Sequence, residues 1–285
     1  MSNQTKQLRK MLKSDQYFVA PCAYDALTAK LIEYAGFKLC GTTGYGMHGA
    51  MLGTPDAGLL AFNEVADTYS KMCDAVNIPI IADGEGGYGN AINIIRTVKT
   101  FEKIGLSGVF IEDQKIPVNC PFLKKTETIS IDEMCGKIRA AIDARKDKNF
   151  IIVARTDAPF DEAIERANAY LEAGADMIKP IPLSRKELEA FPTKINGPLH
   201  LGFTPGKDIN LGLTASDVGK MGYKIITFPM TVLFLSVKAI MEGLKELKES
   251  ESDDVLLEKM IGFDNYFKFI GKEKLLTLNN KYLFK

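Results

Sequence analysis

The sequence predicts one large (β/α)8 barrel, a TIM barrel, followed by extra C-terminal helices. Apolar strand-like segments alternate with amphipathic helical segments nearly from end to end, and the alternation gives about eight units in 285 residues. A barrel of this type typically has ~250 residues. A doubly wound sheet is the competing fold, but it usually carries a glycine-rich phosphate loop after its first strand. Here Ala23-Tyr24-Asp25 follows the first strand, which favours the barrel.

The predicted strands are short apolar runs that end at turn residues. They are residues 18–21, 38–42, 80–83, 108–113, 150–155, 176–179, 199–202 and 223–227. The predicted helices repeat apolar residues every three or four positions. They are residues 25–36, 62–77, 92–104, 131–145, 161–173 and 231–248. Leu27 and Leu31 are expected on the buried face of the first helix, and Ile92 on that of the third.

A polar, charged break at residues 249–254 predicts two parts, a barrel domain of residues 1–248 and an extension of residues 249–285. The extension carries Val255, Leu256, Met260 and Phe263, and is too apolar for a free tail. We therefore expect its helices to pack on the barrel or on a neighbouring subunit.

Composition is that of an ordinary globular protein, with 46% hydrophobic and 25% charged residues and a formal net charge of zero. Nothing in it indicates a nucleic-acid or membrane-surface partner. No apolar run reaches the roughly 18 residues of a spanning helix, and residues 1–13 lack the apolar core of a signal peptide. Five cysteines without C-x-x-C spacing argue against a disulfide framework and a zinc site. A cytoplasmic location is the default expectation.

Active sites of such barrels lie at the C-terminal ends of the strands, and the predicted ends are rich in polar groups. They supply Asp25, Thr42, Thr43, Gly44, Tyr45, Asp83, Glu85, Glu112, Asp113, Arg155, Asp157, Lys179 and Thr204. Asp83 and Glu85 are two residues apart on a strand, so both can face one ligand. Because adjacent carboxylates repel, a hard cation such as Mg²⁺ is the simplest explanation for the pair.

Other strand ends predict an anion site. Arg155 is the expected binder of a substrate carboxylate or developing oxyanion, because its planar fork pairs bidentately. Residues 43–45 offer backbone N–H groups, and Gly44 allows close approach. The polar residues at the strand ends also have purely structural interpretations: Asp157 caps the next turn, Arg155 only pairs with Glu112, and Thr42 is a core hydroxyl.

In order along the chain, several motifs resemble those of the isocitrate lyase/phosphoenolpyruvate mutase superfamily. They are Ala23-Tyr24-Asp25-Ala26, residues 43–46, 53–58, 83–89, 111–114, 154–158 and 222–229, and the likeness covers roughly residues 16–248. The resemblance implies a (β/α)8 barrel, a Mg²⁺ cofactor with Mn²⁺ as an alternative, and a small-molecule carboxylate substrate of the 2-oxo or 2-hydroxy acid class. It also implies a homotetramer, a dimer of dimers that exchange C-terminal helices.

The resemblance also implies roles for individual residues. Matching carboxylates at Asp56, Asp83, Glu85 and Glu112 hold the metal, and Thr43, Gly44, Tyr45 and Arg155 bind the substrate. Tyr45, Arg155 and Cys120 are the expected catalytic residues. Lys179 is added to the substrate-binding set because of its place at a strand end.

The sequence departs from the superfamily pattern at several of these positions. The loop Val118-Asn119-Cys120-Pro121-Phe122 keeps the lyase cysteine but not its basic and histidine neighbours, so Cys120 is expected to be a protonated thiol with a pKa near ~8.5 and to serve as an acid. Its alternative is an incidental loop cysteine. Glu85 is one methylene longer than the usual aspartate.

Two further departures change the charge and shape of the expected pocket. Lys179 stands where a glutamate is usual, and Gly202 where an asparagine is usual. Lys179 could bind a more anionic substrate, replace part of the metal's role, form a Schiff base, or simply pair with Glu85 or Glu112. The remaining expectations concern cysteines and histidines: Cys22, Cys40, Cys73 and Cys135 in the core, His48 near the pocket, and His200 in the barrel interior.

The sequence thus predicts a Mg²⁺-dependent carbon–carbon lyase that cleaves a small 2-hydroxy di- or tricarboxylate of the methylisocitrate or methylmalate kind. On the same fold, the alternatives are a phosphonopyruvate or carboxyphosphonoenolpyruvate mutase or hydrolase and an oxaloacetate decarboxylase. Two more remote alternatives are a Schiff-base aldolase acting through Lys179 and a metabolite-binding protein without catalysis.

Overall fold

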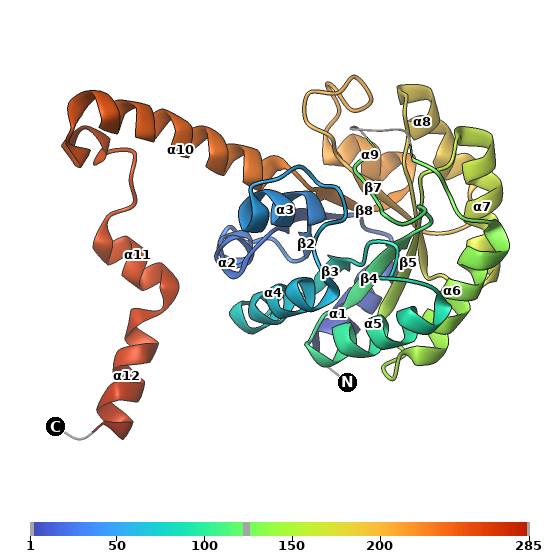
Figure 1. The fold of residues 1–285 in the computed structure, drawn as a ribbon, viewed down its shortest axis with the longest axis horizontal. Coiled ribbons are helices and arrows are strands. Elements are labelled where there is room, and N and C mark those ends of the chain that lie inside the picture. Colours follow the sequence, from blue (N-terminus) through green and yellow to red (C-terminus); the bar gives the residue numbers. More distant parts are fainter. Residues whose placement is uncertain (1–2, 122–125, 284–285) are drawn as a thin grey trace. The chain divides into compact units, whose positions relative to one another are not determined.

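A computed structural model describes residues 3–121 and 126–283. Its first compact unit, residues 1–233, is built on a closed barrel of eight parallel strands that follow one another in chain order, with helices around it (Figure 1). The strands are β1 (Phe18–Ala23), β2 (Cys40–Thr42), β3 (Ile80–Asp83), β4 (Gly108–Glu112), β5 (Ile151–Thr156), β6 (Met177–Pro180), β7 (Leu199–Gly202) and β8 (Tyr223–Phe228). The prediction of a (β/α)8 barrel is confirmed.

The barrel helices follow the strands, and two of them lie between β2 and β3. They are α1 (Asn3–Lys13), α2 (Ala26–Tyr34), α3 (Gly44–Leu52), α4 (Phe62–Ala75), α5 (Ala91–Lys103), α6 (Ile131–Ala144), α7 (Phe160–Glu172), α8 (Arg185–Lys194) and α9 (Ala215–Met221). The C-terminal part holds α10 (Thr231–Ser250), the short 3₁₀ helix η1 (Asp253–Leu256), α11 (Phe263–Ile270) and α12 (Lys272–Tyr282). Among the described helices, none combines the length and hydropathy of a membrane span.

Alternation along the strands separates an apolar layer inside the barrel from a polar layer at its mouth. The apolar layer includes Ile81, Phe110, Val153, Met177 and Ile225. Two residues further along the same strands are Asp83, Glu112, Arg155, Lys179 and Thr227, which line the pocket at the C-terminal ends. Side chains two residues apart on a strand share a face, so the apolar layer lies directly beneath the polar groups that line the pocket.

Helix α1 closes the opposite end of the barrel and was not predicted. Its Leu8 and Leu12 are buried in the same interior cluster as Phe110 and Met177. Leu8 and Leu12 do have helical spacing, but the segment is short and mostly polar and precedes the first strand, so no helix was predicted there.

Three expected core positions are wrong. Leu27, Leu31 and Ile92 are exposed, and Ile92 is 73% exposed. On α2 the small residues Thr28 and Ala29 face inward instead, since the Asp25 carboxylate accepts the Thr28 N–H at 2.7 Å and so sets how the helix begins.

The second compact unit is residues 234–285, so the division falls earlier than the break expected after residue 248. Most of α10 belongs to this unit, because its helix runs without interruption to Ser250. Among the described residues of the unit only Leu256 is buried, and large apolar side chains such as Leu235, Met241, Leu244 and Phe263 are exposed.

Candidate active site

One pocket at the C-terminal ends of the strands gathers almost all of the predicted site residues. It is lined by Thr43, Tyr45, Asp56, Asp83, Glu85, Glu112, Cys120, Arg155 and Lys179. Thr42, Gly202, Thr204 and Thr227 also contribute to the lining. Gly44 is adjacent to it: a Cβ atom at this position would lie 2.7 Å from Oε1 of Glu85 and 3.4 Å from Oδ2 of Asp83. A side chain at this position would therefore displace the Glu85 carboxylate from where it lies.

The loop after β3 holds Glu85 in an unusual backbone conformation. Glu85 and Tyr88 have φ angles of 50° and 59°, a left-handed region that costs non-glycine residues free energy. Hydrogen bonds fix the turn from inside: the Glu85 N–H donates to Oδ1 of Asp83 at 3.0 Å, and the Glu112 N–H donates to the Glu85 carbonyl at 2.9 Å. The loop thus aims Glu85 at the groups carried by β3 and β4.

Two buried side chains from the outer helices hold the same loop and were missed from the sequence. Nζ of Lys137 on α6 donates to the Gly86 carbonyl at 2.9 Å, and Oγ1 of Thr97 on α5 donates to the Gly87 carbonyl at 3.2 Å. Both side chains are buried. The sequence does indicate that Lys137 is buried, because it lies three residues after Met134 and four before Ala141, on the apolar face of its helix.

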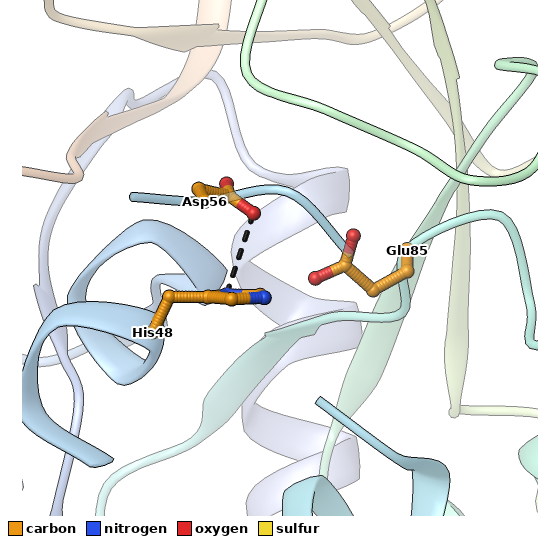
Figure 2. Close-up of side chains that lie close together, drawn as sticks. All are labelled: His48, Asp56 and Glu85. Atoms are coloured by element: carbon orange, nitrogen blue, oxygen red, sulfur yellow. Dashed lines mark ion pairs between the residues drawn. The ribbon is translucent and has the colours of Figure 1, made fainter. Parts of the chain in front are cut away.

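Asp56 and Glu85 meet beside His48 (Figure 2). One ligand atom from each of the three residues lies within 4.8 Å of the others. His48 was expected near the pocket, but both of its ring nitrogens are occupied. Nε2 accepts the Leu59 N–H at 3.0 Å, and Nδ1 lies 2.9 Å from the Gly44 carbonyl and 3.3 Å from Oδ1 of Asp56. This pattern fits an imidazole that carries its proton on Nδ1 and donates it to the Gly44 carbonyl, beside the Asp56 carboxylate.

The pocket concentrates more negative charge than buried carboxylates can keep by themselves. Burial raises the pKa of Glu85 well above its ordinary value, and Asp83 and Glu112 raise it further. Burial also raises the pKa of Glu112, although Arg155 opposes this, and the pKa of Asp56 is raised by burial and by Asp83. Groups in this state need shared protons or a cation.

The donor set fits a hard divalent cation. Asp56, Asp83, Glu85 and Glu112 offer only oxygen atoms, the ligands that Mg²⁺ prefers. Oδ1 of Asp56 is buried and has no hydrogen-bond partner among the described residues, which leaves it available as a ligand. All four side chains are thus of the kind that Mg²⁺ prefers, and two of them, Asp56 and Glu85, belong with His48 to the one group of described residues whose ligand atoms lie within 4.8 Å of one another.

Arg155 on β5 pairs with two carboxylates at once. Its NH1 lies 2.7 Å from Glu112, and its Nε and NH2 each lie 2.9 Å from Asp157. Asp157 and Glu112 raise the pKa of Arg155 well above its ordinary value although burial opposes the charge. The capping alternative for Asp157 is wrong, because Pro159 occupies the N-cap position of α7 and the Asp157 carboxylate pairs with Arg155.

Lys179 on β6 pairs with neither of the expected carboxylates. In the part of the chain that the structure describes it has no ion pair; its Nζ lies 3.7 Å from the centroid of the Phe110 ring. Burial, and then Arg155, lower its pKa to about 8. The expectation that Lys179 pairs with Glu85 or Glu112 is therefore wrong, because β6 places it over an aromatic face instead.

Cys120 is buried and lines the pocket. Its loop is held by the Gln114 side chain, which accepts the Asn119 N–H at 2.9 Å and donates to the Asn119 carbonyl at 3.0 Å. Phe122, the last residue of the expected loop motif, lies outside the described residues. The thiol is thus presented to the same space as the carboxylates and Arg155.

Three other expectations change. Asp25 caps α2 rather than lining the pocket, and Asp113 accepts the Tyr170 hydroxyl at 2.8 Å in a buried network behind the site. Cys22, expected in the core, is buried but lines the pocket. His200 is confirmed as an interior residue, fully buried with Nε2 2.9 Å from Oγ1 of Thr227.

Buried carboxylates and an arginine that line one pocket at the mouth of a (β/α)8 barrel are typical of the active site of a barrel enzyme. The chain belongs to the phosphoenolpyruvate mutase family: the family profile, described as phosphoenolpyruvate phosphomutase, matches residues 8–248. The predicted superfamily is thereby confirmed, and with it the assignment as an enzyme.

Similar proteins cover nearly the whole chain. A 2,3-dimethylmalate lyase of Eubacterium barkeri is 35% identical over 98% of this chain and 98% of its own. A 2-methylisocitrate lyase of Aeropyrum pernix is 37% identical over 93% of this chain and 86% of its own. The crystal structure of a phosphonopyruvate hydrolase in complex with oxalate and Mg²⁺ superposes with a TM-score of 0.91 at 29% identity, covering 100% of both chains.

Proposed function

We propose that this enzyme is a Mg²⁺-dependent carbon–carbon lyase that cleaves a small 2-hydroxy di- or tricarboxylate into a 2-oxo acid and a second carboxylic acid. The observation that carries the proposal is the meeting of Asp56, Asp83, Glu85, Glu112, Arg155 and Cys120 around one pocket. The likeness to lyases over nearly the full length supports this reaction class.

The bound metal would be held by Asp56, Asp83, Glu85 and Glu112, with Mn²⁺ as an alternative ion. When present it supplies positive charge that polarises oxygen atoms of the substrate. The donor set given above fits this role.

The residues of the chain perform the rest of the reaction. Thr43, Gly44 and Tyr45 at the N-terminus of α3 and the Arg155 guanidinium hold the acid end of the substrate and the negative charge that develops there. As the carbon–carbon bond breaks, a carboxylate of the pocket takes the proton of the 2-hydroxyl, which becomes a carbonyl, and the bond's electron pair passes to the departing carbon. The Cys120 thiol gives its proton to that carbon, which completes the second acid.

A screen of 2-hydroxy acids for released pyruvate or glyoxylate tests the reaction. We expect release from alkyl-substituted malates or methylisocitrate, and loss of release when the divalent cation is chelated. Release from phosphonopyruvate with none from the 2-hydroxy acids would instead support a mutase or hydrolase, the alternative favoured by the likeness to the phosphonopyruvate hydrolase. Release from oxaloacetate alone would support a decarboxylase.

The role of Cys120 makes a separate prediction. Replacing Cys120→Ser should lower turnover by about 10²–10⁴-fold, because a hydroxyl is a much weaker acid than a thiol, while substrate binding persists. Steady-state kinetics and calorimetric titration with oxalate measure the two effects. Wild-type turnover in the variant would remove Cys120 from the mechanism.

We also propose a homotetramer, a dimer of dimers that exchange C-terminal helices. Exposed apolar side chains along α10, α11 and α12 support an assembly that covers them. Sedimentation equilibrium should give four times the 31.4 kDa chain mass, and a monomer would contradict the proposal.

A further inference from the structure

Lys179 is a buried cation in the pocket with no anionic partner among the residues that the structure describes. Only 9% of it is exposed, and it shares the pocket lining with Arg155, its neighbour in register on β5. Arg155 is already paired with Glu112 and Asp157. Glu112 and Asp157 are thus paired with Arg155, and the other carboxylates of the pocket belong to the proposed metal site. The Lys179 amine therefore remains available to a ligand.

The surroundings of Lys179 differ from the acidic side of the pocket. The pocket lining also includes Cys22, Phe110, Ile181, Pro182, Ile209 and Met230, which are mostly apolar, and Phe110 lies against the amine. The end of the neighbouring strand β7 leaves space as well, because a Cβ atom on Gly202 would meet nothing nearer than Oγ1 of Thr227 at 3.7 Å. One cation within an apolar wall fits an alkyl-bearing carboxylate.

Contact with the Phe110 ring favours the charged form of the amine. An ammonium over an aromatic face gains electrostatic stabilisation that a neutral amine lacks. Its pKa of about 8 lies above neutral pH, so the group is mostly protonated there. A protonated amine binds anions, whereas the neutral amine is the nucleophile of Schiff-base chemistry, and the trapping experiment below separates the two roles.

We propose that Lys179 forms a second anion subsite, which binds the distal carboxylate of a branched, alkyl-bearing dicarboxylate, on the half of the substrate that leaves as the saturated acid. This inference rests on the proposed lyase function and specifies its substrate class. Arg155 and the residues of α3 bind one end of the substrate, and Lys179 binds the other.

The test compares a methyl-substituted malate with the same compound carrying an amide at its distal carboxylate. Calorimetric titration in the presence of Mg²⁺ measures both affinities for the wild type, Lys179→Met, Lys179→Arg and a matched control, Lys71→Met. Lys71 is an exposed α4 lysine paired with Asp67, so its loss removes the same charge without touching the pocket. Oxalate, which has no distal alkyl carboxylate, reports whether each variant keeps the rest of the site.

We expect the wild type and K71M to bind the diacid at least about tenfold more tightly than its amide, the effect of one charge-assisted hydrogen bond. K179M should lose this preference while its oxalate affinity changes less than about threefold, and K179R should keep it. A K179M protein that retains the preference overturns the proposal. So does a borohydride-trapped adduct of a 2-oxo acid on Lys179, which would make the lysine a covalent catalyst.

Failure of the two proposals can be told apart. If the preference follows Lys179 but no 2-hydroxy acid releases a 2-oxo acid, the anion subsite stands and the lyase reaction is wrong. If a 2-oxo acid is released but the preference for the diacid over its amide does not depend on Lys179, the lyase function is supported and the subsite is wrong.

Discussion

The two sides of the barrel mouth are built on different principles. On the acidic side, Arg155 on β5 pairs with Glu112 on β4 and with Asp157, and Lys137 fixes the backbone of the loop that carries Glu85. On the other side, β6 supplies Lys179, which makes no ion pair among the described residues and lies over the Phe110 ring. We therefore expect the acidic side to be organised before any ligand arrives and the lysine side to be completed by the substrate.

Breaking the acidic side should have the largest effect. Arg155→Met leaves Glu112 and Asp157 buried without their cation, which typically costs about 3–5 kcal/mol of stability. It also removes charge stabilisation in the reaction, so we expect turnover to fall by at least about 10³-fold. Denaturant unfolding and steady-state kinetics measure the two losses.

Arg155→Lys is the informative companion, because it keeps the charge but not the fork that spans two carboxylates. Its stability should lie between those of the wild type and R155M. An R155M protein as active as the wild type would show that the acidic side does not need its guanidinium.

Loosening the support of the acidic side should have an intermediate effect. Lys137→Met removes the hydrogen bond to the Gly86 carbonyl and frees a loop whose Glu85 has a left-handed backbone. Outer contacts of a metal site typically contribute 10–100-fold to affinity, and we expect a loss of about this size for Mn²⁺. Calorimetric titration with Mn²⁺ measures it. K71M serves as the exposed control, and equal affinities in K137M and K71M would rule out this positioning role.

The lysine side should show the smallest effect, as a pH dependence. Protonated Lys179 binds an anion and the neutral amine does not, so the preference for a diacid over its amide should decline as pH rises through about 8. Burial and then Arg155 lower this pKa, while Asp83 on β3, Cys22 on β1 and Asp157 after β5 oppose the lowering. The ratio of kcat/KM for the two compounds, measured from pH 6.5 to 9.5, reports the free enzyme. K179R should keep the ratio over this range, and a wild-type ratio that stays flat would contradict the assignment.

The sequence predicted the strands and most of the pocket because strand ends carry a strong, local pattern. A buried run that ends in Asp83, Glu112, Arg155 or Lys179 needs only period-two reasoning to place its last side chain at the mouth. Helix α3 was missed because its first residues, Gly44-Tyr45-Gly46, have low helix propensity. Helix α8 was missed because it contains Pro192, and proline is disfavoured in the interior of a helix.

What the sequence could not give was the choice of partners across elements. Lys179 was expected to pair with an acid, but its position over Phe110 follows from how β4 and β6 face one another inside the closed barrel. Likewise, the contact between Lys137 and Gly86 joins residues 51 positions apart, and no local period encodes it. Such contacts depend on three-dimensional packing.

The most direct test of the acidic cluster is the stoichiometry of divalent cation binding. Calorimetric or electron paramagnetic resonance titration with Mn²⁺ should find one ion per chain in the wild type, and Asp83→Asn and Glu85→Gln should each weaken it at least about tenfold. Circular dichroism of the variants checks that they remain folded. A wild-type protein that binds no ion, or folded variants that bind it as tightly as the wild type does, would contradict the account.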